Sequence, residues 1–164
     1  MLFARRRPND EERAQLPTNS LEHHASVVDS ILSKIDVNPA HARLVTEQGF
    51  GWNFRRGSAI IEIYVSEQGD RGFLQVLSPI LHLPNTNLLP LYRRLLELNL
   101  QLTNASLGVF FDVVYVFNER PLMGLDANET NDIITMISGY ADDLDNKLAN
   151  EFGGRLYSQV QSGQ

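Results

Sequence analysis

The 164-residue sequence contains no cysteine, and this absence excludes several kinds of chemistry. Without cysteine the chain can form no disulfide, no thiolate nucleophile, no iron–sulfur cluster and none of the common structural zinc sites. It suits a reducing compartment, so we expect a cytoplasmic protein. Long apolar runs are also absent. None approaches the roughly 18 apolar residues of a membrane-spanning helix, because even the leucine-rich stretch from Leu88 carries Arg93, Arg94 and Glu97.

The sequence is also short of positive charge. It has 14 lysine and arginine residues against 20 aspartate and glutamate residues, which gives a formal net charge of -6. Such a chain repels phosphate backbones and anionic lipid surfaces, so we expect neither nucleic acid nor a membrane as a partner. The basic run Arg5-Arg6-Arg7 has Asp10 close behind it, and we interpret it as a solvated tail rather than a nucleic-acid arm. Basic or neutral protein surfaces are the favoured partners.

Motifs for catalysis and cofactor binding are missing as well. The chain has no nucleophile elbow, no phosphate-binding loop and no dinucleotide-binding glycine pattern. No two of its four histidines have the i, i+3 or i, i+4 spacing that directs two imidazoles from a helix to one metal. Asp142, Asp143 and Asp145 fall on or beside the polar arc of a predicted helix, where a solvated face explains them. We therefore predict no catalytic residue, no cofactor and no metal.

What the sequence does contain is the composition of one folded domain. Its 43% hydrophobic and 21% charged residues are close to the globular average, and its length suffices for one core. An aperiodic stretch containing prolines predicts a flexible leader at 1–17, followed by a single domain at 18–154. We expect residues 155–164, beyond Gly153-Gly154, to form a frayed tail.

Hydrophobic periodicity divides the domain into helices and strands. Helical spacing predicts helices at 20–35, about 85–102 and 126–152, and branched and aromatic residues predict strands around 42–48, 52–65, 73–77 and 107–118. Because the strands come in runs that one helix interrupts, we expect a mainly antiparallel sheet and an α+β fold.

Two details of these elements remain open, and two helix starts are more specific. Glycines leave undecided whether 52–65 divides into two strands, and the run 107–118 is either one bent strand or a hairpin. Residues 67–72 are typical of a hairpin loop. The cluster at 85–87 offers capping side chains for the second helix, and Asp126 with Glu129 predicts a capping box for the third.

The second predicted helix carries more apolar surface than one core requires. Its apolar residues spread over roughly 200° of the helix, whereas a helix that faces one core needs little more than about 100°. They are Leu88, Leu89, Leu91, Tyr92, Leu95, Leu96, Leu98, Leu100 and Leu102. We expect a second copy of the chain to cover the remainder, because symmetric dimers are the commonest assemblies. The predicted interface comprises Leu88, Leu91, Tyr92, Leu95, Leu98, Asn99 and Leu102.

Asn99 lies near the middle of that apolar arc, where an unpaired amide would cost on the order of 1 to 3 kcal/mol. We favour a local bond to backbone, with an interface amide that fixes the register of a dimer as the alternative. The run 107–118 is apolar on both faces, with Val109 to Phe117 on one and Phe110 to Val116 on the other. Each face therefore needs cover, from the chain's own helices or from a partner.

Several motifs together resemble those of a known family. They are Leu83-Pro84-Asn85 leading into Leu95-Leu96-Glu97-Leu98-Asn99, Arg120-Pro121-Leu122 with Leu125-Asp126, and Ala141-Asp142-Asp143-Leu144-Asp145 before Leu148 and Phe152-Gly153. The pattern resembles the type III secretion chaperone-like fold over about residues 20–153. It is most similar to the YbjN-type branch, bacterial proteins described as sensory transduction regulators. The resemblance implies the order α-β-β-β-α-β-β-α, an acidic dimer and protein binding without catalysis or cofactor, and it transfers no active-site residues.

Three functional hypotheses follow. The first is a non-catalytic homodimeric protein-binding module, chaperone-like or regulatory, whose candidate client contacts are Trp52, Phe54, Tyr64 and Phe73. Each of these four residues can equally belong to the core. The second is a sensor domain that binds a small ligand between sheet and helices.

The third and most remote hypothesis is an enzyme with an unrecognised site. A buried cluster among His41, Glu62, Asp112 and Glu119 would support it, because burial and mutual proximity shift the pKa values of catalytic groups.

Overall fold

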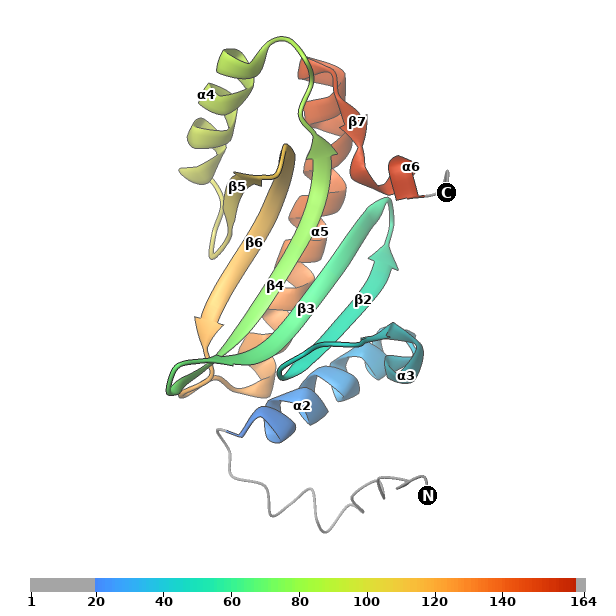
Figure 1. The fold of residues 1–164 in the computed structure, drawn as a ribbon, viewed down its shortest axis with the longest axis vertical. Coiled ribbons are helices and arrows are strands. Elements are labelled where there is room, and N and C mark those ends of the chain that lie inside the picture. The colour runs from blue at the N-terminus through green and yellow to red at the C-terminus, as the bar shows by residue number, and fades with distance from the viewer. Residues whose placement is uncertain (1–19, 162–164) are drawn as a thin grey trace.

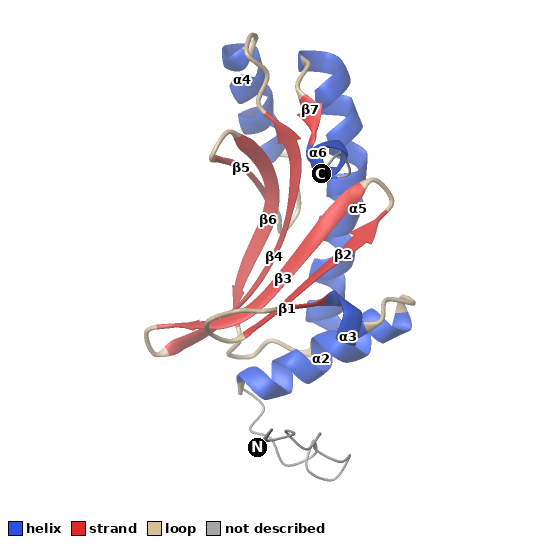
Figure 2. Cartoon of the chain, turned by 45° about the vertical axis from the view of Figure 1, so that its right-hand side comes forward, coloured by secondary structure: helices blue, strands red, loops and turns tan. Residues whose placement is uncertain are grey.

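The computed structural model describes residues 20–161, and a seven-stranded antiparallel sheet forms its centre (Figure 1 and Figure 2). Six strands follow the order β1-β2-β3-β4-β6-β5, and β7 pairs with β4 off this path. The strands are β1 (Arg43–Leu44), β2 (Phe50–Arg56), β3 (Ala59–Gln68), β4 (Arg71–His82), β5 (Ser106–Phe110), β6 (Val113–Pro121) and β7 (Arg155–Leu156). The helices are α2 (Leu21–Lys34), α3 (Pro39–Ala42), α4 (Leu88–Asn99), α5 (Ala127–Phe152) and α6 (Tyr157–Gln161). The predicted α+β fold is confirmed.

One face of the sheet holds the core. Alternate residues of the central strands point toward α2 and α5 and are fully buried, among them Trp52, Ile63, Val76 and Val116. Figure 1 shows α5 passing behind the sheet, and no helix crosses in front of β3, β4 and β6. We call the side turned away from α2 and α5 the open face.

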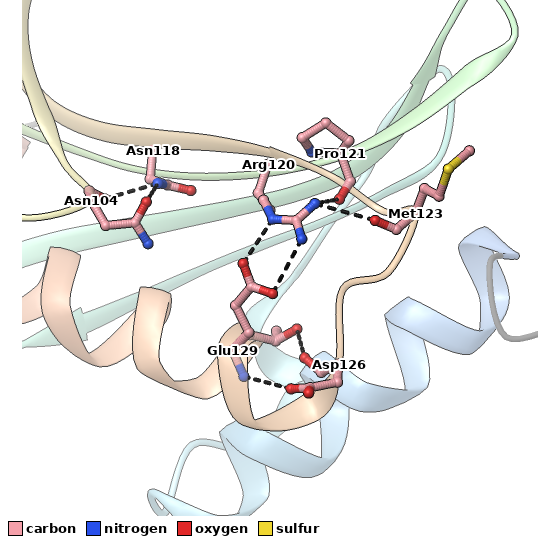
Figure 3. A network of polar contacts seen from close by, with 8 residues as sticks. Asn104, Asn118, Arg120, Pro121, Met123, Asp126 and Glu129 are labelled. Atoms are coloured by element: carbon pink, nitrogen blue, oxygen red, sulfur yellow. Dashed lines mark hydrogen bonds and ion pairs between the residues drawn. The ribbon is translucent and has the colours of Figure 1, made fainter.

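The helix ends follow the predicted capping only in part. Ser20 caps α2 by accepting the His23 N–H at 3.1 Å, and Asp126 caps α5 by accepting the Glu129 N–H at 2.8 Å. The capping box is wrong in one respect, because the Glu129 carboxylate binds the Arg120 guanidinium instead, with a shortest distance of 2.7 Å (Figure 3). For α4, Asn87 is the N-cap, but its φ of 61° leaves it without a side-chain capping bond.

The run 52–65 divides into β2 and β3 at a tight turn. Gly57 has a φ of 57°, which favours glycine. The Ser58 N–H and hydroxyl donate to Asp142 Oδ1 at 2.9 and 3.0 Å, and the hydroxyl also reaches Asp145 Oδ2 at 2.5 Å. The turn is thereby attached to α5. Asp145 is only 2% exposed, so the prediction of a solvated carboxylate is wrong for this residue, which the turn covers.

This attachment predicts a pH-dependent contribution to stability. Hydrogen bonds from Ser58, first from its backbone N–H and then from its hydroxyl, lower the pKa of Asp142 below its ordinary value. A carboxylate with a lowered pKa stabilises the fold above the pKa of the unfolded chain, and this contribution is lost as the pH falls below about 4. We expect Asp142→Ala to lower the Tm at pH 7 by at most roughly 2–4 °C, a small effect because the site is exposed.

The control for this measurement is Asp143→Ala, which removes the neighbouring exposed carboxylate. Scanning calorimetry between pH 7 and pH 3 should show that the difference in Tm between wild type and Asp142→Ala becomes smaller as the pH falls. The Tm of Asp143→Ala should stay close to that of wild type at every pH. A Tm difference between wild type and Asp142→Ala that does not change with pH would contradict the proposed contribution of the Asp142 carboxylate.

The run 107–118 is a hairpin. Its turn residues Phe111 and Asp112 have φ values of 44° and 59°, and a two-residue turn with positive φ at both positions matches the twist of antiparallel strands. The reversal regroups the side chains, because Val109 now faces Val114 and Phe110 faces Val113. The face assignment that treated the run as continuous is therefore wrong for β5.

The C-terminal segment differs from its prediction. Residues 155–161 form β7 and α6 instead of a frayed tail, because β7 finds a partner in β4. The predicted leader at 1–17 and the last residues, 162–164, lie outside the described part of the chain.

Candidate functional site

The exposed large apolar side chains of the described residues gather mainly on α4 and on the β5–β6 hairpin. On α4, Leu91, Leu95 and Leu98 are buried against the chain's own core. Opposite them runs a stripe at intervals of three and four residues. This α4 stripe consists of Leu89, Tyr92, Leu96 and Leu100, with exposed fractions of 80%, 38%, 69% and 90%. The helix therefore presents apolar side chains in two directions, as its sequence predicts.

The residues that face outward are only partly the ones predicted for the interface. Of the seven candidates, Leu91, Leu95 and Leu98 point inward and Leu102 is half-buried, whereas Leu88 and Tyr92 are exposed. Leu89, Leu96 and Leu100 were missed. The width of an apolar arc does not tell which of its sides meets the chain's own sheet. The i, i+4, i+8 spacing of Tyr92, Leu96 and Leu100 is the signal that could have found the stripe.

Asn99 lies between these two sides of α4 and has both of its amide groups paired. Its Oδ1 accepts the Leu107 N–H at 2.7 Å, and its Nδ2 donates to the Leu107 carbonyl at 3.2 Å. Leu107 belongs to β5, the outermost strand on this side of the sheet. The favoured prediction of a bond to backbone is confirmed, and the amide joins α4 to the strand edge as another strand would.

The β5–β6 hairpin adds exposed aromatic rings to this end of the molecule. Phe110, Phe111 and Phe117 are 62%, 84% and 41% exposed, and the first two contact each other edge to face at 4.3 Å between centroids. Phe110 and Phe117 lie on the open face by their strand register. Figure 1 shows α4 next to β5, so the stripe and these rings occupy the same end of the molecule.

The part of the open face that β3 and β4 form is aromatic and partly polar. Tyr64 and Phe73, two predicted client contacts, lie there half-buried. The Tyr64 hydroxyl donates to Glu62 at 2.9 Å. Burial, followed by the negative charge of Glu62, raises the pKa of Tyr64, so its hydroxyl remains a donor. This face can therefore contact a partner through aromatic rings and a fixed carboxylate.

The other two predicted contacts, Trp52 and Phe54, are in the core at 0% and 7% exposure, because their strand positions point toward α2. The Trp52 indole donates to Asp29 of α2 at 2.9 Å. Asp29 also pairs with Arg43 at 2.8 Å, and the Arg43 guanidinium lies 4.5 Å from the Trp52 ring centre. These residues fasten α2 to the sheet and offer no surface to a partner in this form.

Two hollows open between helices. One, of about 400 Å³, lies between α4 and α5 and is lined by Leu98, Leu144, Leu148 and the charged residues Arg94, Lys147 and Glu151. The other, of about 510 Å³, lies between α2 and the first turns of α5. Both have mixed polar and apolar linings.

The candidates for an enzymatic site do not form a buried cluster. Glu62 is half-buried, whereas His41, Asp112 and Glu119 are exposed. Across residues 20–161, no three histidine, aspartate or glutamate side chains gather in a way that could hold a metal ion. In the same range, no helix combines the length and apolar character needed to cross a bilayer.

One solved structure shares this fold. The crystal structure of the ExsC-ExsE complex contains a chain similar to this one, with a TM-score of 0.58 at 10% identity, covering 78% of this chain and 95% of that one. A chain in the structure of the HopA1-SchA chaperone-effector complex gives a TM-score of 0.46 at 14% identity, covering 83% and 99%. No curated protein matches the sequence. Residues 22–160 match the family described as "T3SS (YopN, CesT) and YbjN peptide-binding chaperone 1", and the chain belongs to this family.

Proposed function

We propose that the protein is a non-catalytic, cytoplasmic, peptide-binding chaperone that acts as a homodimer. The α4 stripe is the observation that carries the dimer. Three of its leucines are more than two-thirds exposed, while the opposite side of the same helix is buried in the core. Exposed apolar patches of this kind are typical of interaction sites.

A second copy of the chain is the occupant that fits the stripe best. The stripe is apolar and runs along most of α4, so two copies could pack their α4 helices together about a two-fold axis, and each residue would then contribute to the interface twice. The rings of Phe110 and Phe117 lie at the same end of the molecule and would extend the buried area beyond the helices.

The client is an extended segment of another protein. The family description supports peptide binding. Two features of the chain suit an extended peptide. The outer edge of β2 pairs with β1 only at Gly51 and Trp52, so residues 53–56 have no strand partner on that side. The open face carries Tyr64 on β3, opposite Gly51 of β2, and Phe73 on β4, opposite Ser66 of β3, and such aromatic rings can contact the side chains of a bound peptide.

The test uses fluorescein-labelled peptides of about 15 residues that alternate apolar and polar positions, together with versions of the same peptides in which two central residues are replaced by proline. We expect saturable binding of the alternating peptides by fluorescence anisotropy and at least about tenfold weaker binding of the proline versions, because proline lacks the N–H that a strand must donate. Tyr64→Ala should weaken binding, and Glu67→Ala at the exposed end of the same strand should not. Absence of saturable binding by every peptide would refute the proposal.

A further inference from the structure

The pairing between β3 and β4 stops before β4 ends. The last pair is Glu62 with Leu77, and the same register would bring Ile61 opposite Ser78 and then Ile60 opposite Pro79. Proline has no N–H to donate, so the ladder cannot continue there. The Ser78 hydroxyl donates to the Ile60 carbonyl at 2.7 Å in its place. Beyond this point β4 has an edge that β3 does not cover. We call this edge, at residues 80–82, the β4 notch.

The chain's own C-terminal segment occupies the β4 notch. β7 pairs with it antiparallel, Leu156 opposite Leu81 and Arg155 opposite His82. The next residue, Tyr157, stacks on the His82 ring with 5.3 Å between centroids and 19° between planes. Figure 1 shows β7 beside the upper end of β4. The segment is thus bound as an added strand with one aromatic anchor.

Gly154 makes this approach possible. Its φ of 97° is strained for any other residue, and a Cβ at this position would lie 2.6 Å from the His82 carbonyl oxygen. Gly153 before it also has a positive φ, of 79°. Because glycine adopts many backbone conformations, two adjacent glycines allow residues 155–157 either to enter the notch or to move away from it.

The attachment is short. β7 contributes two residues and α6 five, and so brief a strand and helix gain little stability on their own. The segment stays in place because it is tethered, which gives it an effective concentration on the order of millimolar at its site.

We propose that the β4 notch is a second strand-binding site, which residues 155–157 occupy within the chain and which an extended client segment takes when they leave. This rests on the proposed function, since it names where a client strand binds and what it must contain. The segment that fits has an aliphatic residue followed by an aromatic one, as Leu156 and Tyr157 are. The C-terminal segment therefore inhibits client binding at this edge.

The experiment uses the full chain with Gly154→Ala, which strains the link and places a methyl group against the His82 carbonyl. The control is Gly124→Ala, which introduces an alanine at a φ of 74° where nothing lies within 4 Å of the added carbon. The probe is a fluorescein-labelled peptide with the sequence of residues 153–161, and a version with alanine at the tyrosine position tests the anchor. Hydrogen exchange at the amides of residues 155–157 and of residues 80–82 reports whether the segment has left the notch.

We expect Gly154→Ala to speed exchange at these amides and to bind the probe at least about tenfold more tightly than wild type and Gly124→Ala. The alanine version of the probe should bind the released variant more weakly. If the segment is released and the probe binds no better, the inference is wrong. If exchange shows the segment docked in both Gly154→Ala and a second variant, Tyr157→Ala, it is wrong as well.

The outcome for the proposed function can be read separately. If wild type binds the alternating client peptides and releasing the segment leaves probe binding unchanged, the chaperone proposal stands and the notch proposal falls. If the released variant binds the probe but no client peptide binds any form, the notch is a strand-binding site for the chain's own segment and the chaperone proposal falls.

Discussion

We expect Leu96→Glu to yield a folded monomer at concentrations at which the proposed wild-type dimer is intact. Leu96 is 69% exposed in the protomer and lies in the middle of the α4 stripe, so the fold loses little when it is replaced. In a two-fold interface each substitution appears twice, and two carboxylates would have to be buried close to each other. Burying unpaired carboxylates costs several kcal/mol. Because each 1.4 kcal/mol of binding free energy changes a dissociation constant tenfold, we expect that of the dimer to rise at least about a hundredfold.

Sedimentation equilibrium over a wide concentration range measures this constant. Gln101→Glu is the matched control, because it adds the same charge to an exposed position just beyond the same helix, away from the stripe. It should leave the dimer intact. If wild type is a monomer at every concentration, or if both substitutions weaken the dimer equally, the proposed interface is wrong.

We expect Trp52→Ala to lower the free energy of unfolding by about 3–5 kcal/mol, the usual effect of truncating a large aromatic side chain in a core. The ring is fully buried, and its loss also removes the indole donor to Asp29 and the surface against which the Arg43 guanidinium lies. Trp52→Phe keeps most of the packing and should lose distinctly less. The hypothesis that Trp52 is a client contact predicts the opposite, a stable protein with weakened binding.

Guanidinium denaturation followed by circular dichroism checks this prediction, because the chain has a single tryptophan and its fluorescence disappears with the substitution. Tyr64→Ala, a truncation on the open face, is the comparison and should destabilise the chain less. A Trp52→Ala protein as stable as wild type that no longer binds peptides would show that the side chain acts at the surface.

Local patterns were sufficient for most elements of the fold. Ser20 and Asp126 mark helix starts because capping depends on residues three positions apart, and the predicted helix boundaries at Ile35 and Phe152 agree with the structure to within about a residue. The apolar excess of α4 was also evident from spacing alone. The ends of strands were harder to predict. The turns at Gly57 and Phe111 interrupt runs whose composition is typical of strands throughout.

The sequence by itself determined the element types, the antiparallel α+β class, and the presence of more leucine on α4 than one core requires, because each depends on periodicity within a short segment. Only the tertiary structure decided which leucines face outward, since that depends on Asn99 meeting Leu107 across the chain. The tertiary structure also decided that the C-terminal segment pairs with β4 as the strand β7. Pro79 ends the pairing of β3 with β4 and leaves an edge that residues more than 70 positions later can fill, and no local pattern records a contact over that distance.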